Sequence, residues 1–345
     1  MKKRNSAIEI LRVLCILGIL IMHKSGVLWG KAAGWQIWYL CFVNCFNAES
    51  TILMLIASYY GNPYSSRKRL LKLWIMVLLY SWISVAFEIY RNGITDYSDI
   101  LKSVFPIASG GTWFASAYII IYMLAPFIEK LLNSLDEKGF RALLLVMFSF
   151  YIIMPSFLYV AIEPDSGKNM LTLLCVYLLG RYIKRYNIFS RFTVQKWGGI
   201  ATSLFILQLL LARGTCLFWN LIGHEGAWMP FSRDLSITNV LLGVSIVGFA
   251  SNFTFYNKYI NALGKHAYEM ILFERIAVML FSSLNNWLFD NYLFALAVLI
   301  SAVIVMFEGF IVAVFRAKLF GKIEDKMITK VADNIKILIK NLKLG

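Results

Sequence analysis

The sequence has few charged residues for its length, and acidic residues are the scarcest. Only 15% of the 345 residues are charged, whereas soluble domains carry about a quarter. The chain holds 19 Asp and Glu against 34 Lys and Arg, which gives a formal net charge of +15. Hydrophobic residues make up 59% of the sequence. This composition excludes an ordinary soluble globular domain and leaves an integral membrane protein.

Cysteine is also sparse, and its placement does not suit a metal site. Each cysteine falls in or beside an apolar run, without a nearby histidine or cysteine pair at metal-binding spacing. We therefore expect no metal, and we expect the five to be small apolar core residues: Cys15, Cys41, Cys45, Cys175 and Cys216. The first apolar segment contains Arg12 and lacks a small-residue cleavage site, which predicts an uncleaved first helix instead of a signal peptide.

Long apolar runs recur along the whole chain. A helix that crosses a bilayer needs about 20 largely apolar residues, so the runs predict an all-α, polytopic transmembrane bundle of about ten spans. The predicted spans cover residues 7–24, 36–60, 70–90, 112–130, 140–160, 169–184, 197–213, 236–252, 266–284 and 293–316. We therefore expect a membrane-embedded domain over residues 1–316 and a tail over residues 317–345.

Lysine and arginine alternate between the predicted loops. With the N-terminus in the cytoplasm, the predicted inner segments before the tail carry 17 of these residues and the outer segments carry 7. The tail from Arg316 adds 8 on the inner side. By the positive-inside rule, this bias predicts ten spans, both termini in the cytoplasm and a place in the plasma (inner) membrane. It also explains the net charge without a nucleic-acid partner.

The tail is predicted to form an amphipathic helix. Its lysines alternate with apolar residues at helical spacing, namely Ile323, Met327, Val331, Ile335, Leu338 and Leu342. Such a pattern is typical of a helix that lies on an anionic membrane surface, so we expect membrane lipids among the partners. A solvated helix is the alternative.

The first predicted span carries three ionisable residues, Glu9, Arg12 and His23. Arg12 and His23 are eleven residues apart, which corresponds to three turns plus about 20°, so they share a helix face about 16 Å apart along the axis. Ionisable groups inside a membrane are costly and usually face a cavity or a partner. A guanidinium suits phosphate groups and an imidazole suits proton transfer to or from a hydroxyl. An ion pair with a packed histidine is the structural alternative.

Further ionisable residues lie in later spans. Glu49 follows Asn44 and Asn47 in the second span and is the best candidate to line a cavity. The ninth span holds Glu269, Glu274 and Arg275, and the tenth holds Glu308. Each of these could instead form a structural ion pair. A basic cluster opens the third span at residues 65–72, either as a topology signal or as a binding site.

Several of these segments together resemble one family. The run at residues 9–12 followed by His23, and the Trp-Phe segment at residues 111–118 with its later Tyr and Pro at 122–127, are similar to segments of the acyltransferase-3 family of membrane O-acyltransferases. The paired basic residues Arg69 and Lys72 and the Gly-Arg-Tyr segment at residues 180–182 fit the same pattern. The resemblance covers nearly the whole chain.

The resemblance implies a reaction. An acyl group, usually acetyl, would pass from cytoplasmic acyl-CoA to a hydroxyl of an extracytoplasmic glycan such as exopolysaccharide or capsule. Arg12, Arg69 and Lys72 would hold the CoA phosphates, and His23 would be catalytic, either as a base or as a transient acyl carrier. Tyr59 and Trp113, together with Glu9, Glu49 and Glu274, are the residues expected to line the cavity.

The sequence also departs from the family pattern. Members commonly show Tyr-x-x-His near the C-terminal end, where this chain has Ile271 and Glu274, and they commonly have Arg where this chain has Lys72. An inactive relative within a polysaccharide-assembly complex is therefore one alternative. A transporter or flippase of a lipid-linked sugar is another, since a polar column through the first helix serves either function. The sequence leaves open whether the acyl group is acetyl, which sugar accepts it and what the oligomeric state is.

Overall fold

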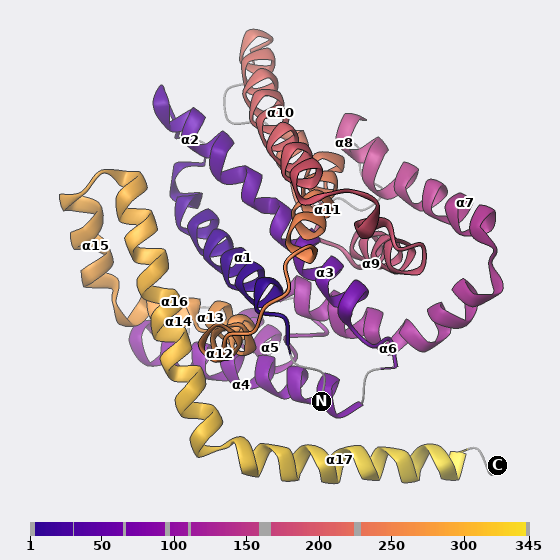
Figure 1. The fold of residues 1–345 in the computed structure, drawn as a ribbon. Coiled ribbons are helices and arrows are strands. Elements are labelled where there is room, and N and C mark those ends of the chain that lie inside the picture. The colour runs from indigo at the N-terminus through magenta and orange to yellow at the C-terminus, as the bar shows by residue number, and fades with distance from the viewer. Residues whose placement is uncertain are drawn as a thin grey trace.

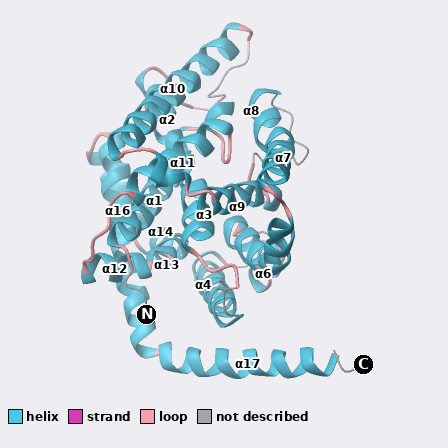
Figure 2. Cartoon of the chain, turned by 45° about the vertical axis from the view of Figure 1, so that its right-hand side comes forward, coloured by secondary structure: helices cyan, strands magenta, loops and turns pink. Residues whose placement is uncertain are grey.

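The chain folds into helices with short connections. A computed structural model describes residues 4–29, 31–64, 67–93, 97–109, 112–158, 167–223 and 229–342. Within these ranges the backbone is helical nearly throughout and forms no strand (Figure 2). The all-α prediction is therefore confirmed for the described part of the chain.

The α-helices are α1 (Ser6–Ser25), α2 (Trp35–Asn44), α3 (Ala48–Tyr60), α4 (Arg67–Asn92), α5 (Tyr97–Val104), α6 (Trp113–Ser134), α7 (Glu137–Phe148), α8 (Met154–Leu158), α9 (Met170–Arg185), α10 (Val194–Leu221), α11 (Ile237–Ser251), α12 (Lys258–Lys265), α13 (Ala267–Leu272), α14 (Glu274–Leu280), α15 (Ser282–Asn291), α16 (Phe294–Leu319) and α17 (Gly321–Leu342). Four short 3-10 turns, η1 (Gly26–Leu28), η2 (Cys45–Asn47), η4 (Ile188–Arg191) and η5 (Pro230–Ser232), and one π-turn, η3 (Ser149–Ile153), join or extend them.

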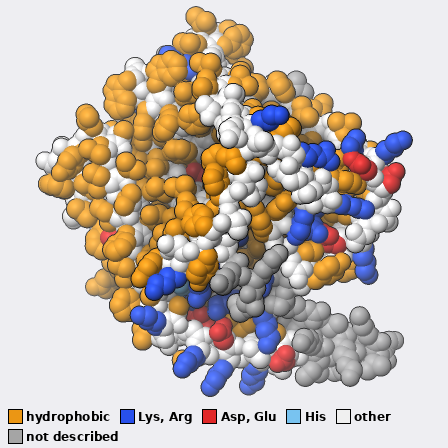
Figure 3. All heavy atoms as spheres, viewed as in Figure 1, with side chains coloured by type: hydrophobic (Ala, Val, Ile, Leu, Met, Phe, Trp, Pro, Cys, Tyr) orange, Lys and Arg blue, Asp and Glu red, His pale blue; other side chains and the backbone are white. Residues whose placement is uncertain are grey.

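Seven helical stretches within the described residues are long and apolar enough to cross a bilayer. They are Ser6–Leu28, Trp35–Tyr60, Lys68–Asn92, Trp113–Ser134, Glu137–Phe157, Val194–Leu221 and Phe294–Leu319. Each overlaps one of the ten predicted spans. Hydrophobic side chains cover much of the face in Figure 3, and the charged side chains gather along its right and lower edges. This surface is suited to a lipid environment.

The other three predicted spans correspond to shorter or interrupted helices. Helix α9 has 16 residues and α11 has 15, both below the usual spanning length. The predicted span 266–284 is divided into α13, α14 and the start of α15, with breaks at Phe273 and Phe281. The polar residues Glu274 and Arg275 directly follow the first break, and they interrupt the apolar run of the sequence.

Helix α1 lies inside the bundle, where it packs against α3, α12, α13 and α16 (Figure 1). Its N-terminus is fixed by the chain that links α11 to α12. The Asn5 side chain caps α1 by accepting from the Ala7 N–H and donates to the Phe253 carbonyl at 2.8 Å, and the Ser6 N–H donates to the Phe255 carbonyl at 2.9 Å. The anchored start determines which face α1 presents to its neighbours.

Helix α17 extends away from the end of α16 and runs below the bundle in both ribbon views (Figures 1 and 2). Two polar contacts join it to α4: Lys72 Nζ lies 2.8 Å from Asp325 Oδ1, and Lys68 Nζ donates to Thr329 Oγ1. Its buried face includes Ile328, whereas the predicted apolar positions Ile323, Met327 and Val331 are exposed. The side chains of Ile335, Leu338 and Leu342 lie outside the described residues.

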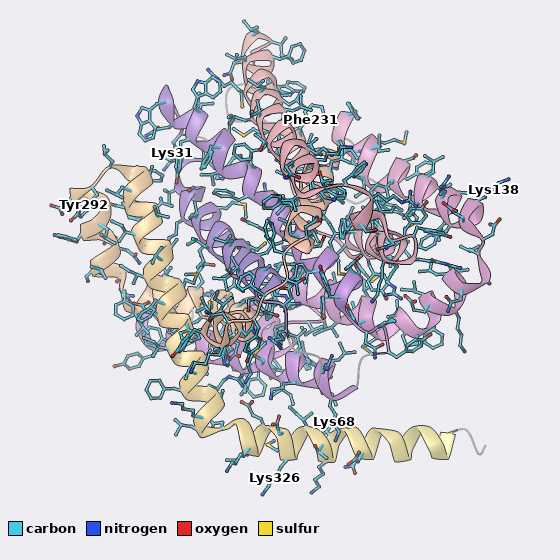
Figure 4. The ribbon with its side chains drawn as sticks, viewed as in Figure 1. Lys31, Lys68, Lys138, Phe231, Tyr292 and Lys326 are labelled. Atoms are coloured by element: carbon cyan, nitrogen blue, oxygen red, sulfur yellow. The ribbon has the colours of Figure 1, made fainter. Side chains whose placement is uncertain are left out.

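Figure 4 labels residues from several predicted loops. Lys68 and Lys326, from predicted inner segments, lie at the lower end of the view, and Lys138 lies at its right. Lys31 and Tyr292, from predicted outer segments, lie at the upper left. In this view Lys138 lies at about the same height as Tyr292, well above Lys68 and Lys326.

Candidate active site

Two neighbouring cavities lie along α1. The one beside its C-terminal half has a volume of about 320 Å³ and is lined by His23, Glu49, Trp113 and Glu274, among others. The one beside its N-terminal half has a volume of about 280 Å³ and is lined by Arg12, among others. We call them the outer and the inner cavity, after the predicted orientation of α1.

The two cavities share a wall. Five residues line both of them: Ile16, Leu53, Phe114, Ala115 and Tyr268. Four of these side chains are apolar, and the phenol of Tyr268 is the exception. Helix α1 thus presents Arg12 to one cavity and His23 to the other, and the two cavities adjoin at these five residues. The spacing of about 16 Å between the two residues follows from three turns of helix.

Arg12 is held by an ion pair within α1. Its Nη1 lies 2.9 Å from Glu9 Oε1, one turn earlier, and Arg4 Nη1 lies 3.6 Å from Glu9 Oε2. The Glu9 side chain is buried, while 30% of the Arg12 side chain stays exposed toward the inner cavity. A Cβ at Gly264 would overlap Glu9, so glycine is required where α12 meets α1. Glu9 thus orients Arg12 instead of lining the cavity.

The inner cavity is lined by positive charge. Arg4, Arg12 and Lys265 line it, and the described lining includes no aspartate or glutamate. The sequence indicated Arg12, whereas Arg4 and Lys265 counted only as inner-loop charges. Such an arrangement is suited to anions, in particular to phosphate groups, which guanidinium groups bind in a bidentate manner.

The predicted basic pair Arg69 and Lys72 does not line either cavity in the described structure. Lys72 contacts Asp325 of α17, as described above. Arg69 lies within electrostatic range of the Tyr118 hydroxyl, and Tyr118 lines the inner cavity. Arg69 is therefore within electrostatic range of one residue of the inner cavity, and Lys72 is engaged with Asp325.

In the outer cavity, His23 contacts Glu274. His23 Nδ1 lies 2.7 Å from Glu274 Oε2, and the carboxylate is more buried than the imidazole, with 15% of its side chain exposed against 48%. Glu274 is placed there because α14 begins at this residue, directly after the break at Phe273. With Nδ1 protonated and donating to Glu274, Nε2 would keep its lone pair and accept a proton.

Glu49 lines the outer cavity where α3 packs against α1. It lies in the first turn of α3, just after the 3-10 turn η2, and a Cβ at Gly18 of α1 would overlap its Oε1. Its Oε2 is buried and has no hydrogen-bond partner in the described part of the chain. The neighbouring Asn47 donates to the Ser232 carbonyl at 2.5 Å, so the loop before α11 folds down onto the break in the second span. This places a buried carboxyl group between α1, α3 and that loop.

The loop before α11 also brings Asp234 into the outer cavity, a residue that the sequence did not indicate. Asp234 is buried, and its Oδ2 lies 3.7 Å from Lys168 Nζ, which lines the same cavity. Burial raises the pKa of the Asp234 carboxyl, and the charges of Lys168 and His23 partly oppose this shift. No short motif marks the pair, because 65 residues of intervening sequence separate two loops that meet only in the fold.

Two aromatic residues proposed from the sequence have different environments. Trp113 begins α6 and lines the outer cavity. Tyr59 lines neither cavity in the described structure; its ring packs against Phe189, with centroids 4.9 Å apart, and against Tyr60. Tyr59 is therefore a packing residue at the end of α3.

The other segments that resemble the family meet at that same end of α3. Tyr122 donates to the Ala57 carbonyl at 2.6 Å, and Arg181 Nη1 donates to the Ser58 carbonyl at 3.2 Å. A Cβ at Gly180 would overlap the Ser58 hydroxyl. These motif residues join α3, α6 and α9, so they support the site through packing. All five cysteines are buried thiols.

The fold and the paired cavities define a class, that of multi-pass helical membrane proteins with two adjoining cavities inside the helical bundle. A model of the acyltransferase-3 family, described as an acyltransferase domain, matches residues 5–313. The chain belongs to this family and is a membrane acyltransferase. Neither the search of curated proteins nor the search of solved structures gave a match.

Proposed function

We propose that the protein is an O-acyltransferase of the plasma (inner) membrane. It takes an acyl group, preferentially acetyl, from acyl-CoA in the cytoplasm and transfers it to a hydroxyl of an extracytoplasmic glycan such as exopolysaccharide or capsule. One observation supports this most directly: Arg12 and His23 face two cavities that share a wall. A two-substrate transfer across a membrane needs a donor site and an acceptor site in this relation.

The inner cavity is the proposed donor site. Its cations Arg4, Arg12 and Lys265 match the phosphates of CoA. The pantetheine arm of CoA is long and uncharged, so it can extend past the residues of the shared wall into the outer cavity while the phosphates remain bound at Arg12. Arg69 and Lys72 would guide the nucleotide part at the mouth of the cavity. Lys72 would exchange its exposed pair with Asp325 for a phosphate, a small loss because exposed ion pairs contribute about 0–1 kcal/mol.

The outer cavity is the proposed acceptor site. A sugar hydroxyl attacks the thioester carbonyl while His23 Nε2 takes the hydroxyl proton. The tetrahedral intermediate then collapses, the C–S bond breaks, and His23 returns the proton to the leaving sulfur. The products are the O-acyl ester and free CoA. Glu274 is a positioning residue that holds the imidazole and stabilises its protonated form.

We propose a topology of ten spans with both termini in the cytoplasm. The seven long spans, together with α9, α11 and the interrupted segment α13–α15, make up these ten spans. Short or broken helices are tolerated at membrane depth where protein surrounds them. In this orientation the lysines of α17 face the inner leaflet, where its exposed apolar residues can contact lipid.

Two measurements on the full-length protein in membranes test the function. In the first, release of CoA thiol from acetyl-CoA is followed for the wild type and for His23→Gln; we expect the variant to lose about 10²- to 10⁴-fold in rate while its membrane insertion stays normal. In the second, surface glycans of cells with and without the chain are compared by mass spectrometry. A sugar-bound acyl group that disappears with the chain supports the proposal. Unchanged glycans together with no CoA release would contradict it.

A further inference from the structure

The ionisable groups of the outer cavity are unbalanced in charge. Three carboxyl groups line it, those of Glu49, Asp234 and Glu274. The described lining offers one ammonium group, that of Lys168, and the imidazole of His23. The next cation along α1, Lys24, is not part of this lining. The outer cavity is therefore formally acidic, in contrast to the inner cavity with its three cations.

The cations of the outer cavity already face carboxylates. Lys168 Nζ lies 3.7 Å from Asp234 Oδ2, and His23 Nδ1 lies 2.7 Å from Glu274 Oε2. Glu49 belongs to neither of these two pairs, and its Oε2 is buried with no hydrogen-bond partner among the described residues. Asp234 also lies within electrostatic range of both His23 and Glu49. An anionic ligand would thus find, in the described lining of the outer cavity, no cationic side chain that does not already face a carboxylate.

The same cavity offers groups that suit an uncharged sugar. Trp113 and Phe114 supply ring surface against which the C–H face of a sugar can pack. The free oxygens of Glu49 and Asn47 are buried and have no described hydrogen-bond partner, so they can accept from sugar hydroxyls. Pockets of this kind are mostly apolar with a few precisely placed polar atoms.

Given the acyl transfer proposed above, we propose that the acceptor is an uncharged sugar, and that the Lys168–Asp234 pair and Glu49 select against acidic sugars. A uronate or phosphosugar that placed its hydroxyl at His23 would bring its own negative charge among these carboxylates. One unfavourable charge at this range lowers the specificity for the acidic acceptor by about tenfold or more.

Replacing either member of the Lys168–Asp234 ion pair gives two matched variants, with opposite expected effects on the preference for an uncharged acceptor. The assay uses the full-length protein in membranes with acetyl-CoA, and it compares methyl glucoside with methyl glucuronide as acceptors. We expect the wild type to prefer the glucoside by about tenfold or more in kcat/KM. Asp234→Asn should lower this preference and Lys168→Gln should raise it. A general structural defect would move both variants in the same direction and would overturn the assignment.

Glycan analysis decides the natural acceptor. The acyl group that depends on this chain should be found on a residue without a carboxylate or phosphate, and its presence on a uronate or phosphosugar would overturn the proposal. Equal or faster acylation of methyl glucuronide by the wild type would overturn it too. CoA release with methyl glucoside as the acceptor, compared between the wild type and His23→Gln, shows separately whether acyl transfer itself has failed.

Discussion

His23 Nδ1 lies 2.7 Å from Glu274 Oε2, although 251 residues separate the two along the chain. Helix α1 provides the imidazole and the first turn of α14 provides the carboxylate. The break between α13 and α14 puts that carboxylate at the depth of the histidine. Glu274, one of the positions where the sequence is expected to depart from the family pattern, thus contacts the proposed catalytic residue.

Replacing Glu274 by Gln should lower kcat for acyl transfer by about 10²-fold or more, because the amide neither stabilises the imidazolium nor fixes the productive tautomer. The KM for acyl-CoA should stay unchanged, since Glu274 does not line the inner cavity. Glu274→Asp should restore part of kcat. Steady-state kinetics of both variants measure this split.

The control for that prediction is Glu88→Gln. Glu88 pairs with Arg275, the residue next to Glu274, but it does not line the outer cavity. Its replacement should leave kcat within a few-fold of the wild type. Equal losses in the Glu274 and Glu88 variants would show that the acidic side chains matter only for the fold.

Arg12→Ala should raise the KM for acyl-CoA by about tenfold to a hundredfold, because charge-assisted hydrogen bonds are worth about 1.5–3 kcal/mol. The KM of Arg12→Lys should lie between those of the wild type and Arg12→Ala, since an ammonium group keeps the charge and loses the bidentate geometry. The dependence of CoA release on acyl-CoA concentration provides the measurement. An unchanged KM in Arg12→Ala would remove this residue from the donor site.

Gly18→Ala should destabilise the protein by about 1–3 kcal/mol and impair the outer cavity, since the added Cβ would overlap Glu49 Oε1. Gly199→Ala in α10 is the matched control, because no atom lies within 4 Å of its added Cβ. There, alanine should be neutral or stabilise the helix by about 1 kcal/mol. Thermal unfolding of both variants in detergent should separate them, and equal melting temperatures would contradict the described contact.

The sequence predicts the long spans well because twenty apolar residues in a row have few other stable states than a membrane helix. It does not predict that residues 266–284 break into short helices. That break depends on which neighbours surround Glu274 and Arg275, and apolar periodicity carries no such information. The sequence also predicts spans at α9 and α11, whereas these helices have only 16 and 15 residues, below the usual spanning length.

The sequence likewise predicts only some residues of the candidate site. The spacing of Arg12 and His23 on one helix follows from 3.6 residues per turn, and the cost of Glu49 inside a membrane marks it as a cavity candidate. Asp234 and Lys168 lie in loops, where charged residues are common and carry no signal. Tyr59 illustrates the opposite case, because a match to a family segment indicates shared packing as readily as a shared cavity.

The most direct test of the account is a structure of the protein with a non-hydrolysable acetyl-CoA analogue. We expect the phosphates to contact Arg12 in the inner cavity and the acyl carbonyl to lie beyond the shared wall, so that an acceptor hydroxyl can lie about 3–3.5 Å from this carbonyl beside His23 Nε2. An analogue bound with its acyl group outside both cavities, or with the shared wall closed between the acyl group and His23, would contradict it.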